Sequence, residues 1–366
     1  MEHGPTPAAL AYVPAVPAGR RCYWSGAGVP TLMRSERSRA TCILHYPLTI
    51  ISAMSSDSER PLLENSEIVD AVIVGGGIAG LSAGLFLARA GRSTIVYDAG
   101  RSRIFAVERI REFVGFDGRT PQEMLTRARE EVLRYGAQIR SGIVTKIEPR
   151  SDGLFDLFVP DVTITTRSVV LATGLIDDLP PLKGLRKLWG RDLRICPCFD
   201  GNEVRNQRFV VFGLPERLAQ LGSWVSMWSP KVKVVTKHSF DPSGAERMRL
   251  LGIEVIRDEV IGLVHEDDRL VAVSTESGSE IPCDAAWIAT RLKPASDLAA
   301  SLCDVDDAGF AKSDEHGRTS RPGVFAIGNA SNPIAHLAHA AAAGTEVGPW
   351  VTMYLLESLL SERRGA

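Results

Sequence analysis

"IVDAVIVGGGIAGLSAGLFLARAG", residues 68–91, is the stretch that decides the fold. It begins with a continuous apolar run, which is typical of a strand buried on both faces of a parallel sheet. Three glycines in the spacing G-x-G-x-x-G, Gly75, Gly77 and Gly80, follow directly. An apolar helix comes next, and Gly91 ends it. This order of strand, turn and helix predicts a dinucleotide-binding unit.

Each glycine of the loop has its own physical reason to be there. Gly75 permits a tight turn, Gly77 lets a pyrophosphate approach the backbone, and Gly80 lets the helix lie close to the strand. Free amides at the start of the helix would then bind the phosphates. Asp98 ends the next strand, where an acidic residue binds the ribose hydroxyls. A glycine turn in another α/β fold is the alternative, and the surrounding pattern favours the dinucleotide site.

A second strand–helix–strand unit occupies residues 207–238. We therefore predict an α/β fold with two Rossmann-like (three-layer ββα) domains. The first domain, which contains the glycine loop, is split between residues 66–178 and 289–366. The second domain, residues 179–288, is inserted between its two parts.

Two other segments of the first domain have clear signatures. "PQEMLTRAREEVLRYG", residues 121–136, has the pattern of an amphipathic helix, with Pro121 in its first turn and Gly136 as its end. Residues 142–174 predict a small insert of three strands that ends in "ATG".

The composition is that of an ordinary globular protein, with 366 residues, 45% of them hydrophobic, and a net charge of -2. The near-zero charge gives no support for a nucleic-acid or membrane-surface partner. No apolar run reaches the roughly 20 residues that a membrane span needs. Residues 1–65 are rich in Pro, Ala, Arg and Ser. They are either a transit peptide or a disordered extension upstream of a start at Met54, and we expect the extension.

Six cysteines in a chain of this length do not form a disulfide framework. Cys196 and Cys198, within "ICPCFDGNEV", residues 195–204, are the one closely spaced pair. Such a pair is a redox pair, part of a metal site, or a chance occurrence. For the scattered cysteines we expect no role beyond burial; these are Cys22, Cys42, Cys283 and Cys303.

Two distant segments favour FAD over NAD as the first dinucleotide. "VVLATG", residues 169–174, and "GVFAIGN", residues 323–329, resemble parts of the two-dinucleotide flavoproteins. The likeness also implies that a helix beginning near Pro333 directs its N-terminus at the flavin ring. The residues that it assigns to FAD binding are Thr173, Gly174, Gly328 and Asn329.

From about residue 68 to residue 360 the chain resembles the low-molecular-weight thioredoxin reductases. Within that family it is most similar to the thioredoxin reductase-like flavoproteins that close disulfides in small molecules such as gliotoxin and holomycin. The likeness rests on "EFVGFDGRTPQEMLTRAREEVLRYG", "LATGLIDDLPPLKGL", "WGRDLRICPCFDGNEVRNQ" and "IGNASNPIAHLAHAAAAG". It implies FAD as the cofactor, a small-molecule substrate, a homodimer and a cytoplasmic location.

The cysteine pair departs from the family pattern, which is C-P-x-C followed by Asp-Gly or His-Gly. An ungapped match places Cys196 at the first cysteine and Asp200 at the acid–base position. Phe199 then replaces the flavin-facing cysteine, and Cys198 lies one residue early. A C-x-C pair still closes a disulfide, in a smaller and more strained ring that is easier to reduce. Alternatively, the pair has lost its redox role and Phe199 packs against the flavin.

The second glycine loop also departs from the family, which binds NADPH there. "FVVFGLPERLAQ", residues 209–220, keeps Gly213 but replaces the later glycines with Pro215 and bulky residues. Pro215 removes a backbone donor that a phosphate would use. After the next strand, Lys237 and His238 are the basic residues available to a 2′-phosphate. We expect no NADPH binding, which agrees with the dithiol oxidases, where molecular oxygen takes the electrons.

His336 and His339 stand where the family tends to have Gln and Thr, on the helix that faces the flavin. Their spacing of three puts them on one face. A histidine there would take a proton from a substrate thiol or carbon acid. The alternative is a polar helix face satisfied by water or backbone. A zinc site with Cys196 and Cys198 fits by ligand type, but the flavin is expected to occupy that space, so we predict no metal.

The combined prediction is an FAD-dependent oxidoreductase that acts on the thiols of a small molecule, with a dithiolate attacking a Cys196–Cys198 disulfide. Oxygen reoxidises the enzyme, and Asp200 with His336 or His339 moves protons. One alternative is a flavoenzyme without a cysteine step, in which the substrate meets the flavin directly. A non-catalytic flavin-binding partner or sensor is another alternative. A conventional NADPH-dependent thioredoxin reductase is less favoured than the dithiol oxidase or the flavoenzyme without a cysteine step.

Overall fold

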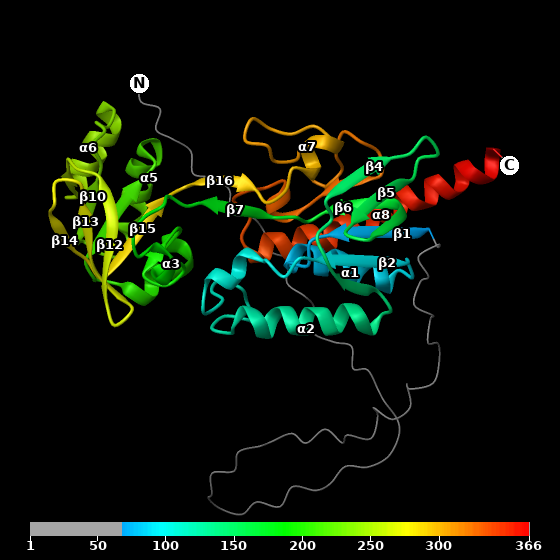
Figure 1. Ribbon diagram of the computed structural model, residues 1–366, viewed down its shortest axis with the longest axis horizontal. Coiled ribbons are helices and arrows are strands. Elements are labelled where there is room, and N and C mark those ends of the chain that lie inside the picture. Colours follow the sequence, from blue (N-terminus) through cyan, green and yellow to red (C-terminus); the bar gives the residue numbers. More distant parts are fainter. Residues whose placement is uncertain (1–67, 366) are drawn as a thin grey trace, which may run out of the picture. The chain divides into compact units, whose positions relative to one another are not determined.

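The computed structural model describes residues 68–365. The predictions for residues 1–65, together with Cys22, Cys42 and Met54, lie outside this range. Within it, strands and helices alternate along the chain, and the strands form two larger and two smaller sheets (Figure 1). The predicted α/β class with two Rossmann-type units is confirmed.

The first sheet contains the glycine loop and has the order β3-β2-β1-β6-β5-β4, with β17 paired to β6. Strands β1, β2, β6 and β17 run parallel, so β1, β6 and β17 finish at the same edge of the sheet. That edge is where open α/β sheets bind ligands. The strands are β1 (Val69–Val74), β2 (Thr94–Asp98), β3 (Gln138–Ser141), β4 (Lys146–Pro149), β5 (Phe155–Val159), β6 (Val162–Leu171) and β17 (Val324–Ala326).

Strand β6 belongs to two parts of this sheet. Residues 162–166 pair antiparallel with β5, and residues 166–171 pair parallel with β1. The three-stranded insert predicted from the sequence is therefore continuous with the main sheet, because β6, with 10 residues, is long enough to serve both. The short β3 was not predicted, since its four residues are half-buried or exposed and lack a strand pattern.

The second sheet is fully parallel, with the order β11-β10-β9-β15-β8. Helices α5 (Pro215–Val225) and α6 (Pro242–Leu250) connect its consecutive strands. Its strands are β8 (Leu193–Arg194), β9 (Phe209–Gly213), β10 (Val232–Val235), β11 (Glu254–Ile256) and β15 (Ala285–Ala289). They fall within the segment predicted to be inserted, except that β15 extends one residue beyond it, to Ala289. The domain boundaries 66–178, 179–288 and 289–366 stay a prediction.

Smaller elements complete the described chain. An antiparallel three-stranded sheet follows β11, and a two-stranded ribbon joins segments on either side of the second sheet. Their bounds are β12 (Val260–Glu266), β13 (Arg269–Thr275), β14 (Glu280–Pro282), β7 (Leu175–Asp178) and β16 (Arg291–Pro294). The shortest α-helices are α3 (Leu185–Leu188), α4 (Pro197–Asp200) and α7 (Leu298–Leu302).

Helices α1 (Ile78–Arg89) and α8 (Leu337–Gly365) lie side by side (Figure 1). Two glycines of α8 permit this close approach. A Cβ on Gly344 would lie 2.1 Å from the Ala79 carbonyl oxygen, and one on Gly348 would lie 2.2 Å from the Phe86 ring. The helices are thus packed at a separation that only glycine allows at these positions.

Local sequence signals fix both ends of α2 (Pro121–Arg134). The Thr120 hydroxyl accepts the Glu123 N–H at 3.1 Å, and the Glu123 carboxylate accepts the Thr120 N–H at 2.8 Å. This is a capping box with proline at the first helical position. Gly136 follows the helix at φ 84°, a conformation that glycine adopts without strain. The predicted start and end of this helix are confirmed.

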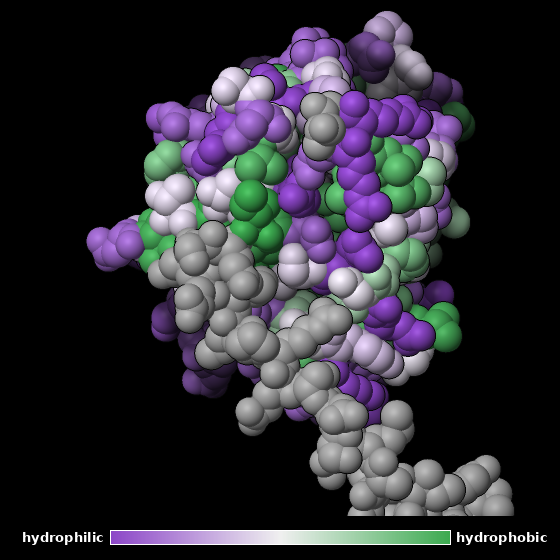
Figure 2. All heavy atoms as spheres, turned by 90° about the vertical axis from the view of Figure 1, so that its right-hand side faces the viewer, coloured by the Kyte–Doolittle hydropathy of each residue, from purple (hydrophilic) through white to green (hydrophobic). Residues whose placement is uncertain are grey.

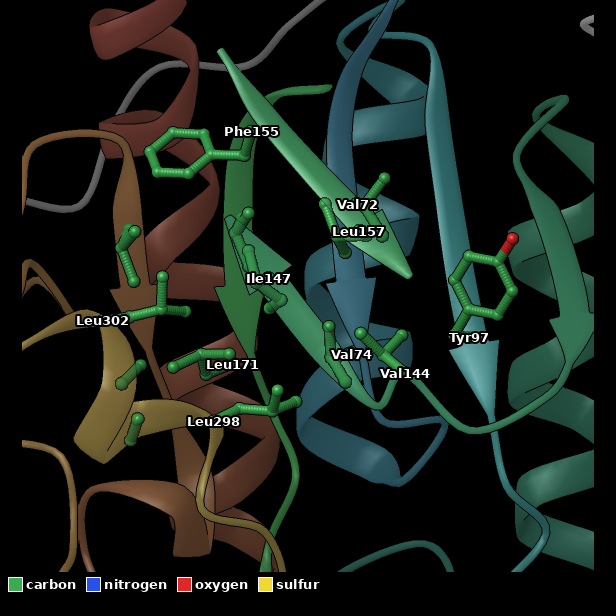
Figure 3. Close-up of a cluster of buried hydrophobic side chains, with 14 of the residues drawn as sticks. Val72, Val74, Tyr97, Val144, Ile147, Phe155, Leu157, Leu171, Leu298 and Leu302 are labelled. Atoms are coloured by element: carbon green, nitrogen blue, oxygen red, sulfur yellow. The ribbon is translucent and has the colours of Figure 1, made fainter. Parts of the chain in front are cut away.

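One face of the first sheet carries a core of interlocking apolar side chains (Figure 3). Leu157 of β5 and Leu171 of β6 are almost completely buried in it. Leu298 and Leu302 of α7 pack on the same cluster, together with Ile147 of β4. Helix α7, which precedes β17, is thereby packed against strands β4, β5 and β6. This packing holds both chain segments at the ligand-binding edge.

The start of α8 differs from the prediction, which placed it near Pro333. The helix begins at Leu337. The Asn329 side-chain amide donates to the carbonyl oxygens of Asn332 at 2.9 Å and Ala335 at 3.1 Å. These bonds stabilise a turn through residues 329–335 in place of a first helical turn, and the residue before a proline disfavours helical geometry.

Hydrophilic and hydrophobic residues are interspersed over the face shown in Figure 2. Neither kind dominates the described atoms on that face. Among the described residues, no helix combines the length and the apolar character needed to cross a bilayer.

The α1–α8 contact predicts the effect of a single methyl group. Gly344→Ala should lower the free energy of unfolding by about 1–3 kcal/mol, because the methyl group overlaps a backbone oxygen that cannot move away. The gain in helix propensity, about 0.5–1 kcal/mol, is too small to offset this. Denaturant titration measures the change, with Thr345→Ala on the exposed face as the control. Equal stability of the Gly344 variant and the wild type would contradict the packing described.

Candidate functional site

The glycine loop brings three backbone segments into contact. Gly75 has φ 124°, and a Cβ on it would lie 2.2 Å from the Ala172 carbonyl oxygen. A Cβ on Gly80 would lie 1.9 Å from the Gly75 carbonyl oxygen. Both positions therefore require glycine, and the end of β1, the end of β6 and the first turn of α1 meet at backbone distance.

Gly77 is different, because space is left around it. A Cβ on this residue would meet only the Ser102 hydroxyl, at 3.7 Å. Gly77 is also the N-cap of α1 and has no side chain to cap the first turn. The amides of that turn are left for a ligand, and the helix dipole favours a negative one. This cradle fits the pyrophosphate of a dinucleotide such as FAD.

Asp98 lies directly beside the loop, since a Cβ on Gly76 would lie 2.3 Å from the Asp98 carboxyl carbon. Its carboxylate accepts the Gly100 N–H at 2.8 Å and pairs with Arg129 of α2 at 2.7 Å. The carboxylate is thus held beside the cradle, with lone pairs left for ribose hydroxyls. Arg129 was not predicted as a partner of Asp98, because it lies 31 residues away in the chain.

The remaining residues assigned to FAD gather at the same edge of the sheet. Thr173 and Gly174 directly follow β6, and Gly174 has φ 74° with open space beside it. Gly328 follows β17, and a Cβ on it would lie 2.8 Å from the Ala79 methyl group of α1. Asn329 shapes the turn that leads to α8, as described above. Four separate segments of sequence thus line one edge.

The cysteines lie on a short turn of the second unit. Cys196 is the N-cap of α4, and both Cys196 and Cys198 are half-buried thiols. Phe199, which takes the place of the family's second cysteine, is also half-buried. Burial, followed by the charge of Cys198, raises the pKa of the Cys196 thiol to about 12. A thiol with this pKa needs a base nearby before it can act as a nucleophile at neutral pH.

An ion pair closes the cysteine turn. The Arg194 guanidinium, two residues before Cys196, contacts the Asp200 carboxylate, two residues after Cys198. The two side chains are only 10% and 13% exposed. Burial raises the pKa of Asp200 to about 6, although the Arg194 charge acts in the opposite direction. Asp200 can therefore exchange a proton near neutral pH. Arg194 was not predicted from the sequence. The signal was its position two residues before Cys196, which mirrors that of Asp200 two residues after Cys198.

The two histidines lie together at the start of α8. The His336 and His339 ring centroids are 6.2 Å apart, and the rings meet edge to face. His336 precedes the first helical residue and accepts the Ala340 N–H with its carbonyl oxygen. Its imidazole Nδ1 lies 2.9 Å from a carboxylate oxygen of Glu112, which sequence reasoning did not single out. Among the described residues, no group of three or more His, Cys, Asp or Glu side chains is arranged to hold a metal.

The second nucleotide loop keeps its shape but has few donors for a phosphate. Gly213 has φ 112°, and a Cβ on it would lie 2.3 Å from the Ala289 carbonyl oxygen. Pro215 has no N–H, and Arg217 donates its N–H to the Leu214 carbonyl. Glu216 adds a carboxylate to the first turn of α5. A phosphate would therefore meet one negative charge and few free amides.

Lys237, one of the two basic residues after β10, is already paired. Lys237 pairs with Glu259 at 2.9 Å and with Glu276. Hydrogen bonds to these two carboxylates raise the pKa of Lys237. A 2′-phosphate would have to displace them.

Cys283 and Cys303 lie away from the cysteine turn. Cys283 is fully buried, and burial raises its thiol pKa to about 12. Cys303 is half-buried and donates to the Ala299 carbonyl at 3.5 Å. Both environments are those of inert packing residues.

An open glycine cradle in one Rossmann unit and a cysteine turn in the other define the class of two-domain flavoprotein oxidoreductases. Residues 69–344 match the family model described as Pyridine nucleotide-disulphide oxidoreductase, and the chain belongs to that family. Its cofactor is FAD, which the cradle at Gly77 fits.

Individual relatives agree with this assignment. The chain is similar to thioredoxin reductase tcpT of Claviceps purpurea, with 28% identity over 82% of this chain and 98% of the relative. Thioredoxin reductase of Listeria monocytogenes is 25% identical over 73% of this chain and 88% of its own. The crystal structure of HlmI superimposes with a TM-score of 0.78 and 31% identity, covering 82% of this chain and 96% of HlmI.

The open space at Gly77 predicts a variant that folds but does not bind FAD. Gly77→Val should keep its secondary structure, because the protein itself leaves room for the side chain, and should lose the flavin because the pyrophosphate cannot approach. Circular dichroism and visible flavin absorbance report the two properties separately. A Gly77→Val protein that purifies yellow and releases FAD on denaturation would refute the assignment of the cradle.

The raised pKa of Asp200 predicts a dependence of stability on pH. Between the usual carboxyl pKa and about pH 6, the unfolded state has released the Asp200 proton, whereas the folded state still holds it. This contribution is complete at low pH and is lost as the pH rises through about 6. Relative to Asp200→Asn, the wild type should lose about 2–3 kcal/mol between pH 4 and pH 7. Urea titrations measure the difference, with exposed Asp161→Asn as the control. Parallel pH profiles for wild type and Asp200→Asn would disprove the prediction.

Proposed function

We propose that this chain is an FAD-dependent oxidoreductase that oxidises the thiols of a small-molecule dithiol, with molecular oxygen as the final electron acceptor. The observation that carries the proposal is the ion-paired cysteine turn in a chain whose second nucleotide loop offers little to a phosphate. A natural-product biosynthetic pathway and a homodimer belong to the same proposal. They are supported by the resemblance of the motifs to the dithiol oxidases.

The cysteines would exchange disulfides with the substrate. One substrate thiolate attacks Cys196 of the Cys196–Cys198 disulfide, and the S–S bond breaks with Cys198 as the leaving sulfur. The second substrate thiolate then attacks its neighbour in the mixed disulfide and releases Cys196. The substrate leaves as a disulfide, and the cysteine pair has gained two electrons.

This order of attack suits the properties of the two sulfurs. Cys196 has a high thiol pKa and matches the first cysteine of the family pattern. The match to the first cysteine makes Cys196 the sulfur that the substrate attacks, with Cys198 as the leaving sulfur of that step. FAD, when bound, would accept the two electrons from the cysteine pair. Oxygen would then reoxidise the flavin and be reduced to hydrogen peroxide.

Asp200 is the proposed proton carrier at the cysteine turn. It lies two residues after Cys198, is almost buried, and has a pKa of about 6. A carboxylate with this pKa accepts the proton of a thiol and returns it within the neutral range. Arg194 would keep the carboxylate in place during both steps.

Independence from NADPH is supported by the α5 turn and by Lys237. The turn combines Pro215 with the Glu216 carboxylate, and Lys237 is paired with two carboxylates. Gly213 does not argue for a nucleotide, because the contact with Ala289 explains it without one.

A second candidate function is a flavoenzyme that acts on its substrate without a cysteine step. It is favoured by Phe199, which occupies the position of the flavin-facing cysteine, and by the Glu112–His336 pair at the start of α8. In this case a histidine would take a proton directly from the substrate.

Single cysteine variants separate the two candidates. Cys196→Ser and Cys198→Ser should each keep FAD and lose dithiol oxidation by orders of magnitude, because serine cannot form a mixed disulfide. Oxygen consumption with a small dithiol measures this loss, and Cys303→Ser is the control that should keep full activity. Thiol labelling of the wild type before and after mild reduction should differ by two sites.

The opposite result identifies the second candidate. If both serine variants retain wild-type turnover while changes at His336 or His339 remove it, the proposed cysteine mechanism is wrong.

A further inference from the structure

A closed loop between the first two helices holds Glu112 in place. The loop spans residues 110–119, and the Ile110 N–H donates to the Arg119 carbonyl at 2.7 Å. The Gly118 N–H donates back to the Ile110 carbonyl at 2.8 Å. Inside the loop, the Phe113 and Phe116 rings stack with centroids 5.7 Å apart. The two hydrogen bonds join the ends of the loop, and both rings pack against a buried cluster, so the loop presents its polar residues in one geometry.

Glu112 has an unusual backbone conformation within this loop. Its φ is 61°, in the left-handed region that residues other than glycine rarely adopt. The Asp117 carboxylate accepts the Glu112 N–H at 3.1 Å and stabilises this conformation. Such strain is retained where the surrounding structure imposes it, and it is frequent at functional sites.

The carboxylate of Glu112 reaches across the fold to His336. Its Oε2 atom lies 2.9 Å from His336 Nδ1, although the two residues are 224 positions apart. The side chains are 37% and 48% exposed, so the pair is accessible to a small molecule. Leu337, the next residue, and Ile78, the first residue of α1 after the glycine cradle, pack against the same buried cluster. The pair therefore lies near the FAD-binding edge.

This contact determines the tautomer of His336. An ionised carboxylate has only acceptors, so Nδ1 must carry the hydrogen in this bond. The lone pair of the neutral ring is then on Nε2, where it is free to accept a proton. The titratable groups that contact His336 are Glu112 from the loop and His339 from α8. Arg111, the neighbour of Glu112, is engaged by Glu203 at 3.1 Å.

His339 has a different environment. Its ring meets His336 edge to face, and within residues 68–365 it has no carboxylate partner. Of the two histidines, His336 is therefore the one with a carboxylate partner and a defined tautomer.

We propose that Glu112 is a positioning residue that holds His336 as the Nδ1–H tautomer, and that His336 Nε2 takes the proton from the substrate thiol. The S–H bond breaks, the thiolate keeps the electron pair, and the imidazolium formed is stabilised by Glu112. The assignment of a thiol as the proton donor rests on the proposed function, whereas the positioning of His336 does not.

Nuclear magnetic resonance of the flavin-loaded, histidine-labelled protein tests the positioning directly. The chain has seven histidines, and the resonance missing from His336→Gln identifies His336. Above the pH range in which imidazole is protonated, the ring ¹⁵N and ¹³C shifts should report the Nδ1–H tautomer. Glu112→Gly, which suits the left-handed backbone, should shift His336 to the Nε2–H tautomer. Glu112→Gln keeps an acceptor oxygen and should retain much of the Nδ1–H form.

Turnover tests the role of the pair in the reaction. Glu112→Gly should lower kcat for dithiol oxidation by about tenfold or more, the usual cost of losing the partner of a working histidine. In the His336→Gln background the same change should have no further effect, because Glu112 acts through His336. Exposed Glu130→Gln is the matched control and should alter neither the tautomer nor turnover.

Each negative outcome has one meaning. An unchanged His336 tautomer in Glu112→Gly overturns the positioning role. A changed tautomer with full turnover overturns the proton transfer. If the wild type oxidises no dithiol at all, the proposed function fails, and the tautomer measurement still decides the role of Glu112.

Discussion

The close backbone contact of α1 with its surroundings is the constraint on which the rest of the site depends. Gly80 lets α1 begin against the Gly75 carbonyl, and Gly344 lets α8 pack against Ala79. With both contacts in place, the free amides of α1 lie at the edge where β1, β6 and β17 end. The same packing holds α8 against α1, and His336 and His339 lie at the start of α8.

The second Rossmann unit keeps its fold although its first helical turn offers little to a phosphate. Its parallel sheet and its strand–turn–helix order are intact, and Gly213 still avoids the Ala289 carbonyl. The residues that differ from the family pattern are those that would contact a phosphate, since Pro215 and Glu216 occupy the first turn of α5. Packing requires the glycine whether or not a nucleotide binds, and the remaining positions are free to change.

Short-range features of this chain were predictable from its sequence, and long-range ones were not. The glycine loop and both ends of α2 follow from turn and capping rules that act within a few residues. The late start of α8 depends on hydrogen bonds from the Asn329 side chain, and the double role of β6 depends on its partner strands. The Glu112–His336 pair joins residues 224 positions apart in the chain, and one sequence does not reveal such a contact.

The central claim is that a dithiol, and not NADPH, delivers electrons to this flavoprotein. Anaerobic rapid mixing of the FAD-loaded protein with each reductant tests it most directly, with the visible flavin absorbance as the signal. The account predicts that a small dithiol bleaches the flavin while micromolar NADPH leaves it oxidised. Rapid, saturable bleaching by NADPH would contradict the account, because it would show that the second nucleotide loop still binds its ligand.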